Sequence, residues 1–176
     1  SNDNTTWSSW ENYTTSKTWT LTSGLGTKTV YAQYRDAANN VSPSASDSIE
    51  VDTSAPTGSV SINSGYQYSS SATVTLTLAA SDVGSGVSSM RFANGGSDWS
   101  TWETYAATKS WQLATGDGNK IVYVQFKDFA DNISETYTDS VVLDTTAPTG
   151  SVSINSGAQY SSSATVTLTC TASDAG

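Results

Sequence analysis

Asp52-Thr-Ser-Ala-Pro-Thr-Gly-Ser-Val-Ser-Ile-Asn-Ser-Gly65 returns almost unchanged as Asp144-Thr-Thr-Ala-Pro-Thr-Gly-Ser-Val-Ser-Ile-Asn-Ser-Gly157, 92 positions further along the chain. The same offset relates the rest of the 176 residues without a gap: residues 52–84 match 144–176 at 28 of 33 positions, and residues 1–51 match 93–143 at 21 of 51. Gapless self-similarity at the length of a small domain is typical of a tandem array. The chain is therefore predicted to hold one complete repeat, residues 52–143. It lies between the C-terminal part of one repeat, residues 1–51, and the N-terminal part of another, residues 144–176.

The two partial repeats together hold 84 of the 92 positions of one unit, and only the counterparts of residues 85–92 are absent. Two interpretations follow. Either the sequence is a window onto a longer array, or partial repeats of different chains complete one another. The sequence leaves both open.

Within the complete repeat, apolar residues alternate with polar ones at the period of a β-strand, and turn residues separate the segments. The residues expected to face inward are Val60, Ile62, Val74, Leu76, Leu78, Ala80, Val87, Met90, Phe92, Trp111, Leu113, Val122, Val124, Phe126, Val141 and Leu143. No segment has the apolar periodicity of a helix. Seven short strands in about 90 residues are typical of an immunoglobulin-like sandwich. We therefore predict an all-β chain of tandem immunoglobulin-like β-sandwich repeats.

Three motifs in fixed order also resemble those of a known family of repeats. They are Asp-Thr-Thr-Ala-Pro-Thr from Asp144, Ala-Ser-Asp-Ala-Gly from Ala172, and Val-Tyr-Val-Gln-Phe-Lys-Asp-x-Ala-x-Asn-x-Ser from Val122. The chain resembles the bacterial and archaeal Ig-like, or fibronectin-III-like, tandem repeats of large surface proteins and adhesins. That family often has glycine where this chain has Asn39 and Asp131, residues that adopt a left-handed backbone less readily.

The composition excludes several classes of function. The chain has 16 acidic and 7 basic residues, a net charge of −9, no histidine and one cysteine. Ser-His-Asp and Cys-His catalysis, histidine metal ligation and an intrachain disulfide are therefore impossible within it, and we expect no enzymatic activity. The acidity argues against nucleic-acid binding, and no apolar run is long enough to insert into a membrane. The cysteine, Cys170, replaces Leu78 at an inward position and is expected in a core.

Carboxylates are expected to meet at one pole of the complete sandwich. The first strand starts there, and the second and sixth strands end there, which brings the loops with Asp52, Asp82, Asp128 and Asp131 together; Asp144 is the counterpart of Asp52 in the next linker. Clustered carboxylates are ligands that Ca²⁺ prefers. Calcium at such junctions is also what the resemblance to adhesin repeats implies. The alternative is that these aspartates cap turns by accepting bonds from backbone N–H groups.

A Trp-rich stretch carries a second candidate site. Trp99, Trp102 and Tyr105, next to Glu103, offer aromatic faces on which sugar rings of surface glycans could stack. The alternative is packing, because a 92-residue sandwich without disulfides needs large buried side chains.

Four asparagines fit the N-glycosylation pattern: Asn4, Asn12, Asn40 and Asn132. Such triplets arise often in a chain rich in serine, threonine and asparagine. The alternative for Asn40 and Asn132, which occupy equivalent sites, is that they close the turn after the sixth strand.

Taken together, the sequence predicts a structural segment of an extracellular or cell-surface protein, in an adhesin stalk or a filament. Its expected partners are neighbouring repeats or copies of itself, and strand complementation between partial repeats would give a head-to-tail polymer. The alternative function is a carbohydrate-binding accessory module that uses the Trp-rich stretch.

Overall fold

The structure, a computed structural model, describes residues 1–174. Strands make up its regular structure, apart from two 3-10 turns, η1 (Asn63–Gly65) and η2 (Asn155–Gly157). The strands are β1 (Gly26–Ala32), β2 (Ala45–Val51), β3 (Thr57–Ile62), β4 (Tyr68–Ser69), β5 (Thr73–Ser81), β6 (Val87–Ala93), β7 (Glu103–Thr104), β8 (Thr108–Gln112), β9 (Gly118–Asp128), β10 (Tyr137–Leu143), β11 (Thr149–Ile154) and β12 (Leu168–Ser173). No helix among these residues is long and apolar enough to cross a membrane. The predicted all-β class is confirmed.

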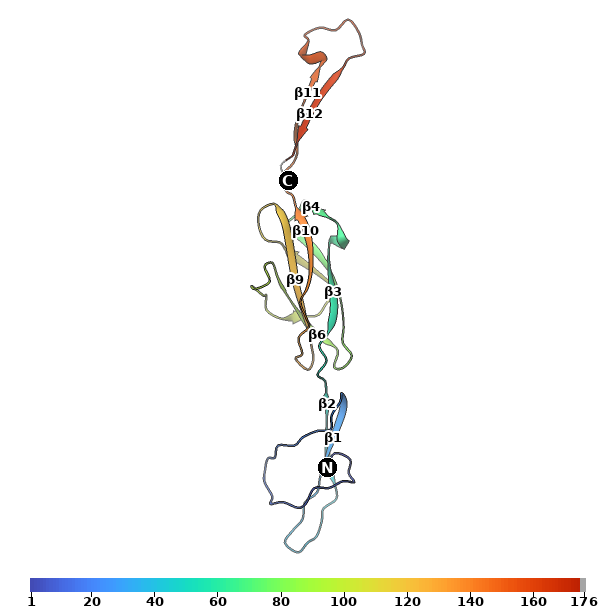
Figure 1. Ribbon diagram of the computed structural model, residues 1–176, viewed down its shortest axis with the longest axis vertical. Helices are drawn as coiled ribbons and strands as arrows, with labels where there is room; N and C mark the ends of the chain where they lie inside the picture. Colours follow the sequence, from blue (N-terminus) through green and yellow to red (C-terminus); the bar gives the residue numbers. More distant parts are fainter. Residues whose placement is uncertain (175–176) are drawn as a thin grey trace. The chain divides into compact units, whose positions relative to one another are not determined.

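The complete repeat is a sandwich of two sheets (Figure 1). One sheet has the order β3-β5-β8, and the other has the order β4-β10-β9-β6-β7. β5 and β8 are antiparallel, with Thr73 opposite Gln112 and Thr77 opposite Thr108. The short β4 lies parallel to β10. Seven of these eight strands correspond to the predicted ones, and β4 is the addition.

The apolar core lies between these two sheets, and its residues follow the alternation seen in the sequence. In β5 the threonines are exposed, while Val74, Leu76 and Leu78, which alternate with them, are at most 3% exposed. The buried apolar residues are Ile62, Val74, Leu76, Leu78, Met90, Phe92, Ala93, Leu113, Val122, Val124, Phe126, Val141 and Leu143. All but Ala93 were expected to face inward, so the core prediction is largely confirmed; Val60, Ala80, Val87 and Trp111 are only half-buried.

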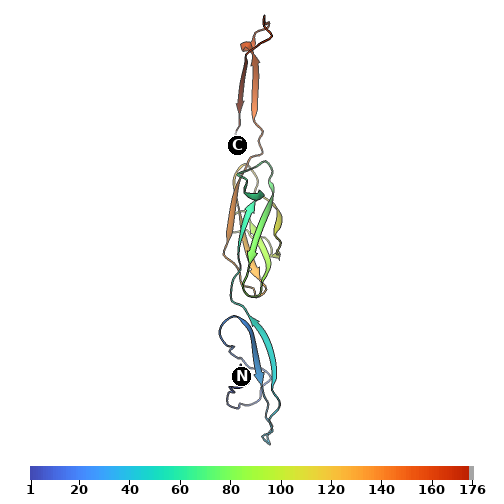
Figure 2. The same cartoon turned by 90° about the vertical axis from the view of Figure 1, so that its right-hand side faces the viewer.

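Each partial repeat forms a two-stranded antiparallel hairpin (Figure 2). The β1–β2 pair matches β9 and β10 of the complete repeat, and the β11–β12 pair matches β3 and β5. The apolar face of the β11–β12 hairpin is exposed, because this partial repeat lacks the opposite sheet: Leu168 is 57% exposed, whereas its counterpart Leu76 is 0% exposed. The prediction that Cys170 is a core residue is wrong for the same reason, since the thiol is exposed. On the β1–β2 hairpin Ile49 is exposed, while Val30 and Val51 are half-buried.

Contacts divide the described residues into two compact units. The first contains residues 1–57, 80–89 and 126–135, and the second contains the others. Strands β3, β5, β6 and β9 have residues in both units. The repeat boundaries after residues 51 and 143 stay a prediction from the sequence. The carboxylates described next belong to the first unit.

The turn after β9 has the left-handed backbone that the glycine of the related repeats would favour. Asp131 has a φ of 67°, and its counterpart Asn39 has a φ of 69°. The Asp131 carboxylate is exposed and accepts a bond from Lys127 at 2.8 Å. Surface ion pairs of this kind contribute little to stability. The free-energy cost of the left-handed backbone at Asp131 is therefore larger than the gain from the ion pair.

We expect Asp131→Gly to be more stable than Asp131→Ala by about 1 kcal/mol, because alanine strains a left-handed backbone and glycine does not. Both variants lack the bond to Lys127, so their difference isolates the backbone term. Urea unfolding of the two variants measures it. Equal midpoints would contradict a strained turn.

Candidate metal centre

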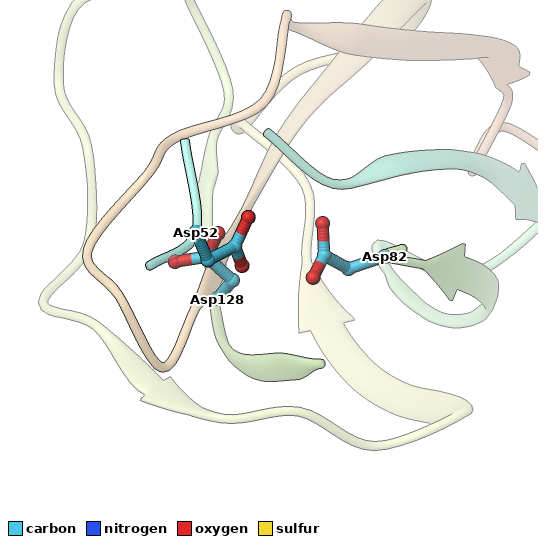
Figure 3. Close-up of side chains that lie close together, drawn as sticks. All are labelled: Asp52, Asp82 and Asp128. Carbon is cyan, nitrogen blue, oxygen red and sulfur yellow. The ribbon is translucent and has the colours of Figure 1, made fainter. Parts of the chain in front are cut away.

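Three aspartates from separate segments meet at one end of the complete repeat. Asp52 follows β2, Asp82 follows β5, and Asp128 is the last residue of β9. Each offers a carboxylate oxygen, and these oxygens lie within 4.8 Å of one another. Figure 3 shows the Asp82 side chain pointing toward the other two. The structure thus brings Asp52, Asp82 and Asp128 together, and their binding of calcium stays a prediction.

The spacing of these oxygens suits a calcium ion. Ca²⁺ binds oxygen at 2.3–2.6 Å, so two ligands of one ion lie at most about 5 Å apart. The three carboxylates meet this limit, and each is half-buried or buried. Carboxylates on three separate loops can supply the oxygen ligands of such an ion, and waters would complete its coordination.

Backbone and side-chain donors fix the position of Asp52. Its Oδ2 atom accepts a bond from the N–H of Ser85 at 2.6 Å, and its Oδ1 atom accepts one from the N–H of Ser54 at 2.9 Å. The side chain and the backbone of Ser85 lower the pKa of Asp52. A lowered pKa keeps this carboxylate charged at neutral pH, which is the state that a cation binds.

Asp128 is also fixed by its turn. Its Oδ1 atom accepts bonds from the N–H groups of Ala130 and Asn132, and its Oδ2 atom accepts one from the Asn132 side chain at 2.8 Å. Asn132 also donates to the carbonyl oxygen of Asp52 at 3.2 Å. The alternative prediction was that these aspartates cap turns, and the bonds to Asp128 are of this kind. They use part of the hydrogen-bonding capacity of the Asp128 carboxylate and hold it beside Asp52.

Asp82 differs from the other two because hydrogen bonds satisfy only one of its oxygens. Its Oδ2 atom accepts bonds from the N–H groups of Gly84 and Gly86 at 3.0 and 2.9 Å. Its Oδ1 atom is buried and has no hydrogen-bond partner. Leaving a buried oxygen of this kind without a partner is costly, and a cation between the three carboxylates would satisfy it.

Gly84 permits the close approach of two of these loops. A Cβ atom at position 84 would lie 2.2 Å from the Cγ atom of Asp52, so the Asp52 carboxylate or the loop would have to shift. Sequence reasoning did not identify Gly84 or Ser85 as parts of the site. The Asp82-Val-Gly84 pattern was the available signal, because a glycine two residues after an aspartate in a loop indicates a close backbone contact.

Two further aspartates named from the sequence lie outside this cluster. Asp131 does not join it, because its exposed carboxylate bonds Lys127 instead. Asp144 lies in the second linker, where its Oδ1 atom accepts a bond from the N–H of Thr146 at 3.1 Å. Its expected partner loops belong to the next repeat, of which the chain holds only the first part.

The second linker is held by a different carboxylate. Asp117, in the turn between β8 and β9, accepts bonds from the hydroxyls of Thr145 and Thr146 at 2.7 and 2.9 Å, and from the N–H of Thr145 at 3.0 Å. These hydroxyls lower the pKa of Asp117, so the carboxylate stays charged and the contact persists at neutral pH. The counterpart of Asp117 in the first partial repeat is Leu25, which cannot accept such bonds.

The equivalent asparagines Asn40 and Asn132 close their turns, as the alternative prediction held. The side-chain amide of Asn132 donates to Asp128 and Asp52, and that of Asn40 donates to Asp36 at 2.8 Å. A glycan on Asn132 would replace one of the two amide hydrogens used in its bonds to Asp128 and Asp52. Asn4 and Asn12 are exposed. Glycosylation of the four asparagines stays a prediction.

The Trp-rich stretch holds an arginine between its indole rings. The Arg91 guanidinium carbon lies 4.8 Å from the centre of the Trp99 ring and 4.6 Å from that of Trp102. Gln125 fixes this arginine, because its Oε1 atom accepts a bond from the Arg91 Nε atom at 2.9 Å. Trp99, Trp102 and Tyr105 are half-buried. Stacking with Arg91 covers one face of each indole, which leaves less aromatic surface for a sugar ring than expected. Carbohydrate binding by this stretch stays a prediction.

Comparisons with known proteins leave the family open. No protein-family model matches the chain, and none of the curated proteins matches it. Among solved structures, it is similar to the fibronectin(III)-like modules of CbhA from Clostridium thermocellum, with 16% sequence identity and a TM-score of 0.43. The similarity covers 69% of this chain and 64% of that one, so the chain spans less than two thirds of the length of that structure. The fold assignment rests on the strands, sheets and core of the chain itself.

Proposed function

We propose that the chain is a structural segment of an extracellular or cell-surface repeat protein, in which each 92-residue unit acts as a rigid spacer in an adhesin stalk or filament. The observation that carries this proposal is the gapless repeat, which returns the same hairpins with the same turn geometry. Asn63 and Asn155, for example, each have a φ of 45°, and the side chain of each accepts a bond from a backbone N–H, of Thr75 and Thr167 respectively. Repetition of one sandwich builds length.

The finer part of the proposal concerns assembly. The hairpins of the two partial repeats expose apolar residues whose counterparts are buried in the complete repeat. Ile49, for example, is exposed, whereas its counterpart Val141 is buried. Large exposed apolar faces favour association. Copies of the chain therefore associate head to tail, and the C-terminal part of one repeat meets the N-terminal part of another.

Sedimentation velocity and negative-stain microscopy over a range of protein concentrations test this assembly. We expect linear polymers that grow with concentration. Leu168→Asp should abolish them, because it places a charge on the exposed apolar face of β12. Thr169→Asp, on the alternate face of the same strand, is the matched control. A monomer at every concentration would contradict head-to-tail assembly.

Glycan-array binding that is lost in Trp102→Ala would instead favour the carbohydrate-binding module.

A second function, calcium binding by Asp52, Asp82 and Asp128, is supported by the buried Asp82 Oδ1 atom that has no partner. Asp52 belongs to the linker that leads into the complete repeat, and the other two aspartates end strands of that repeat. A bound ion would fasten the linker to these strands and would stiffen the junction between repeats.

A further inference from the structure

The turn that follows β6 contains the one Asn-Gly pair of the chain, Asn94-Gly95. Asparagine in front of glycine is chemically labile, because glycine has no side chain to keep its backbone nitrogen away from the asparagine amide. Residues 94–98 are exposed to solvent. The Gly95 N–H has no hydrogen-bond partner among residues 1–174, and a Cβ atom at position 95 would meet nothing within 4 Å. The nitrogen that would attack the amide is therefore open to water.

The Asn94 side chain is held through both polar atoms of its amide group. Its Oδ1 atom accepts a bond from the indole N–H of Trp111 at 2.8 Å, and its Nδ2 atom donates to the carbonyl oxygen of Gln112 at 3.0 Å. These bonds tie the end of β6 to β8. A donor on the amide oxygen also stabilises the negative charge that develops there when a nucleophile adds to the Cγ atom. The contact with Trp111 therefore fixes the side chain and favours attack on it.

The counterpart of Asn94 in the first partial repeat, Asn2, makes the same contacts but precedes a different residue. Its Oδ1 atom accepts a bond from the indole N–H of Trp19 at 2.7 Å, and its Nδ2 atom donates to the carbonyl oxygen of Thr20 at 3.3 Å. The next residue is Asp3, whose backbone N–H donates to a serine hydroxyl at 3.3 Å and whose carboxylate accepts bonds from two other backbone N–H groups. The two asparagines thus share their amide contacts and differ in the nitrogen that would attack.

We infer that Asn94 is a site of spontaneous modification, at which the backbone nitrogen of Gly95 attacks the Cγ atom of Asn94. The nitrogen loses its proton to water or hydroxide and forms a bond to Cγ. The bond between Cγ and Nδ2 then breaks, Nδ2 takes up a proton from solvent and leaves as ammonia, and a succinimide ring remains. Water opens this ring at either of its carbonyl carbons, which gives aspartate or isoaspartate at position 94. The sequence consumes one water and releases one ammonia, so it needs no enzyme and no cofactor.

Both products change the turn. A carboxylate oxygen in place of Nδ2 cannot donate to the carbonyl oxygen of Gln112 and repels it, so the tie between β6 and β8 is lost. Isoaspartate also routes the main chain through the side chain, which lengthens the backbone by one methylene group. Gly96 already lies against the ring of Tyr123, where a Cβ atom would be 3.3 Å from the nearest ring carbon, so a longer backbone displaces the turn from this ring. The same loop leads into the Trp-rich stretch, which the modification therefore disturbs.

Incubation of the full chain in heavy-oxygen water at neutral and mildly alkaline pH tests this inference. Trypsin then releases residues 92–109, which hold Asn94 as their only asparagine, and mass spectrometry with electron-transfer fragmentation measures aspartate and isoaspartate at positions 94 and 2. We expect conversion to be at least about tenfold faster at Asn94 than at Asn2, because only Gly95 offers a free and unhindered nitrogen. The rate should rise with pH, since the attacking nitrogen must be deprotonated, and both products should carry one heavy oxygen atom.

Gly95→Ala is the matched variant, because a Cβ atom at position 95 meets nothing within 4 Å and the backbone there is not left-handed. It should keep the melting temperature of the parent chain and slow the conversion of Asn94 to about the rate of Asn2. Equal rates at the two asparagines of the parent chain, an unchanged rate in Gly95→Ala, or a product without isoaspartate would overturn the inference. Conversion that occurs only in urea would also overturn it, since the fold would then protect the site.

Discussion

Replacing Leu76 by alanine is expected to lower the free energy of unfolding of the complete repeat by about 2 to 5 kcal/mol. Leu76 is 0% exposed in the centre of β5, and removing a buried leucine side chain costs both its transfer from water and the cavity left behind. Chemical unfolding followed by tryptophan fluorescence measures the loss. It is large compared with the usual stability of a small domain.

The repeat supplies a matched control for this substitution. Leu168 is the counterpart of Leu76, but it is 57% exposed. At a concentration at which the chain is a monomer, Leu168→Ala should change the free energy of unfolding by less than about 0.5 kcal/mol. Similar losses in the two variants under these conditions would show that the C-terminal half-repeat is folded against another part of the same chain.

Calcium is expected to raise the melting temperature of the complete repeat by roughly 6 to 11 °C at 10 mM. Extracellular calcium modules bind with dissociation constants near 1 mM at the weak end, and a tenfold excess over this value stabilises the folded state by about 1.4 kcal/mol. For a domain of this size, that free energy corresponds to the stated shift. Differential scanning calorimetry with calcium and with a chelator measures it.

Variants of the candidate metal centre should abolish or weaken this rise in melting temperature. Asp82→Asn removes one of three neighbouring charges, so we expect it to melt no lower than the parent chain in chelator and to lose the calcium shift. Asp98→Asn removes an exposed carboxylate from a different loop and should keep the shift. Gly84→Ala should displace the Asp52 carboxylate and weaken the shift, whereas Gly95→Ala should not, because a Cβ atom at position 95 meets nothing within 4 Å. An unchanged melting temperature in the parent chain would contradict a calcium site.

The fold was predictable from the sequence because its main determinants are local. Alternation of threonine with valine and leucine in β5 sets which face is buried, since successive side chains of a strand point to opposite faces. The short β4 was not predictable, because Tyr68 and Ser69 form a strand only through their parallel pairing with β10. The exposure of Cys170 was missed because alternation identifies the inward face and cannot tell whether another sheet covers it.

The candidate metal centre was predictable in outline and not in its details. The topology of a sandwich brings the ends of β5 and β9 together with the first linker, so Asp52, Asp82 and Asp128 could be grouped from the sequence. Asp131 lies outside the cluster because its carboxylate pairs with Lys127 across the turn, and the sequence did not show this contact. The Arg91 stack on Trp99 and Trp102 is a contact between separate segments, which the spacing of the tryptophans does not reveal.

The bonds of Asp117 to the second linker bear on how such an array would respond to mechanical load. When a chain is pulled from its ends, residues 144–146 cannot extend until the three hydrogen bonds to Asp117 break. The first linker has Leu25 at the corresponding turn and has no such tether there. The two linkers would therefore lengthen at different forces. One turn residue per repeat would thus set the order in which the joints of a stretched fibre yield.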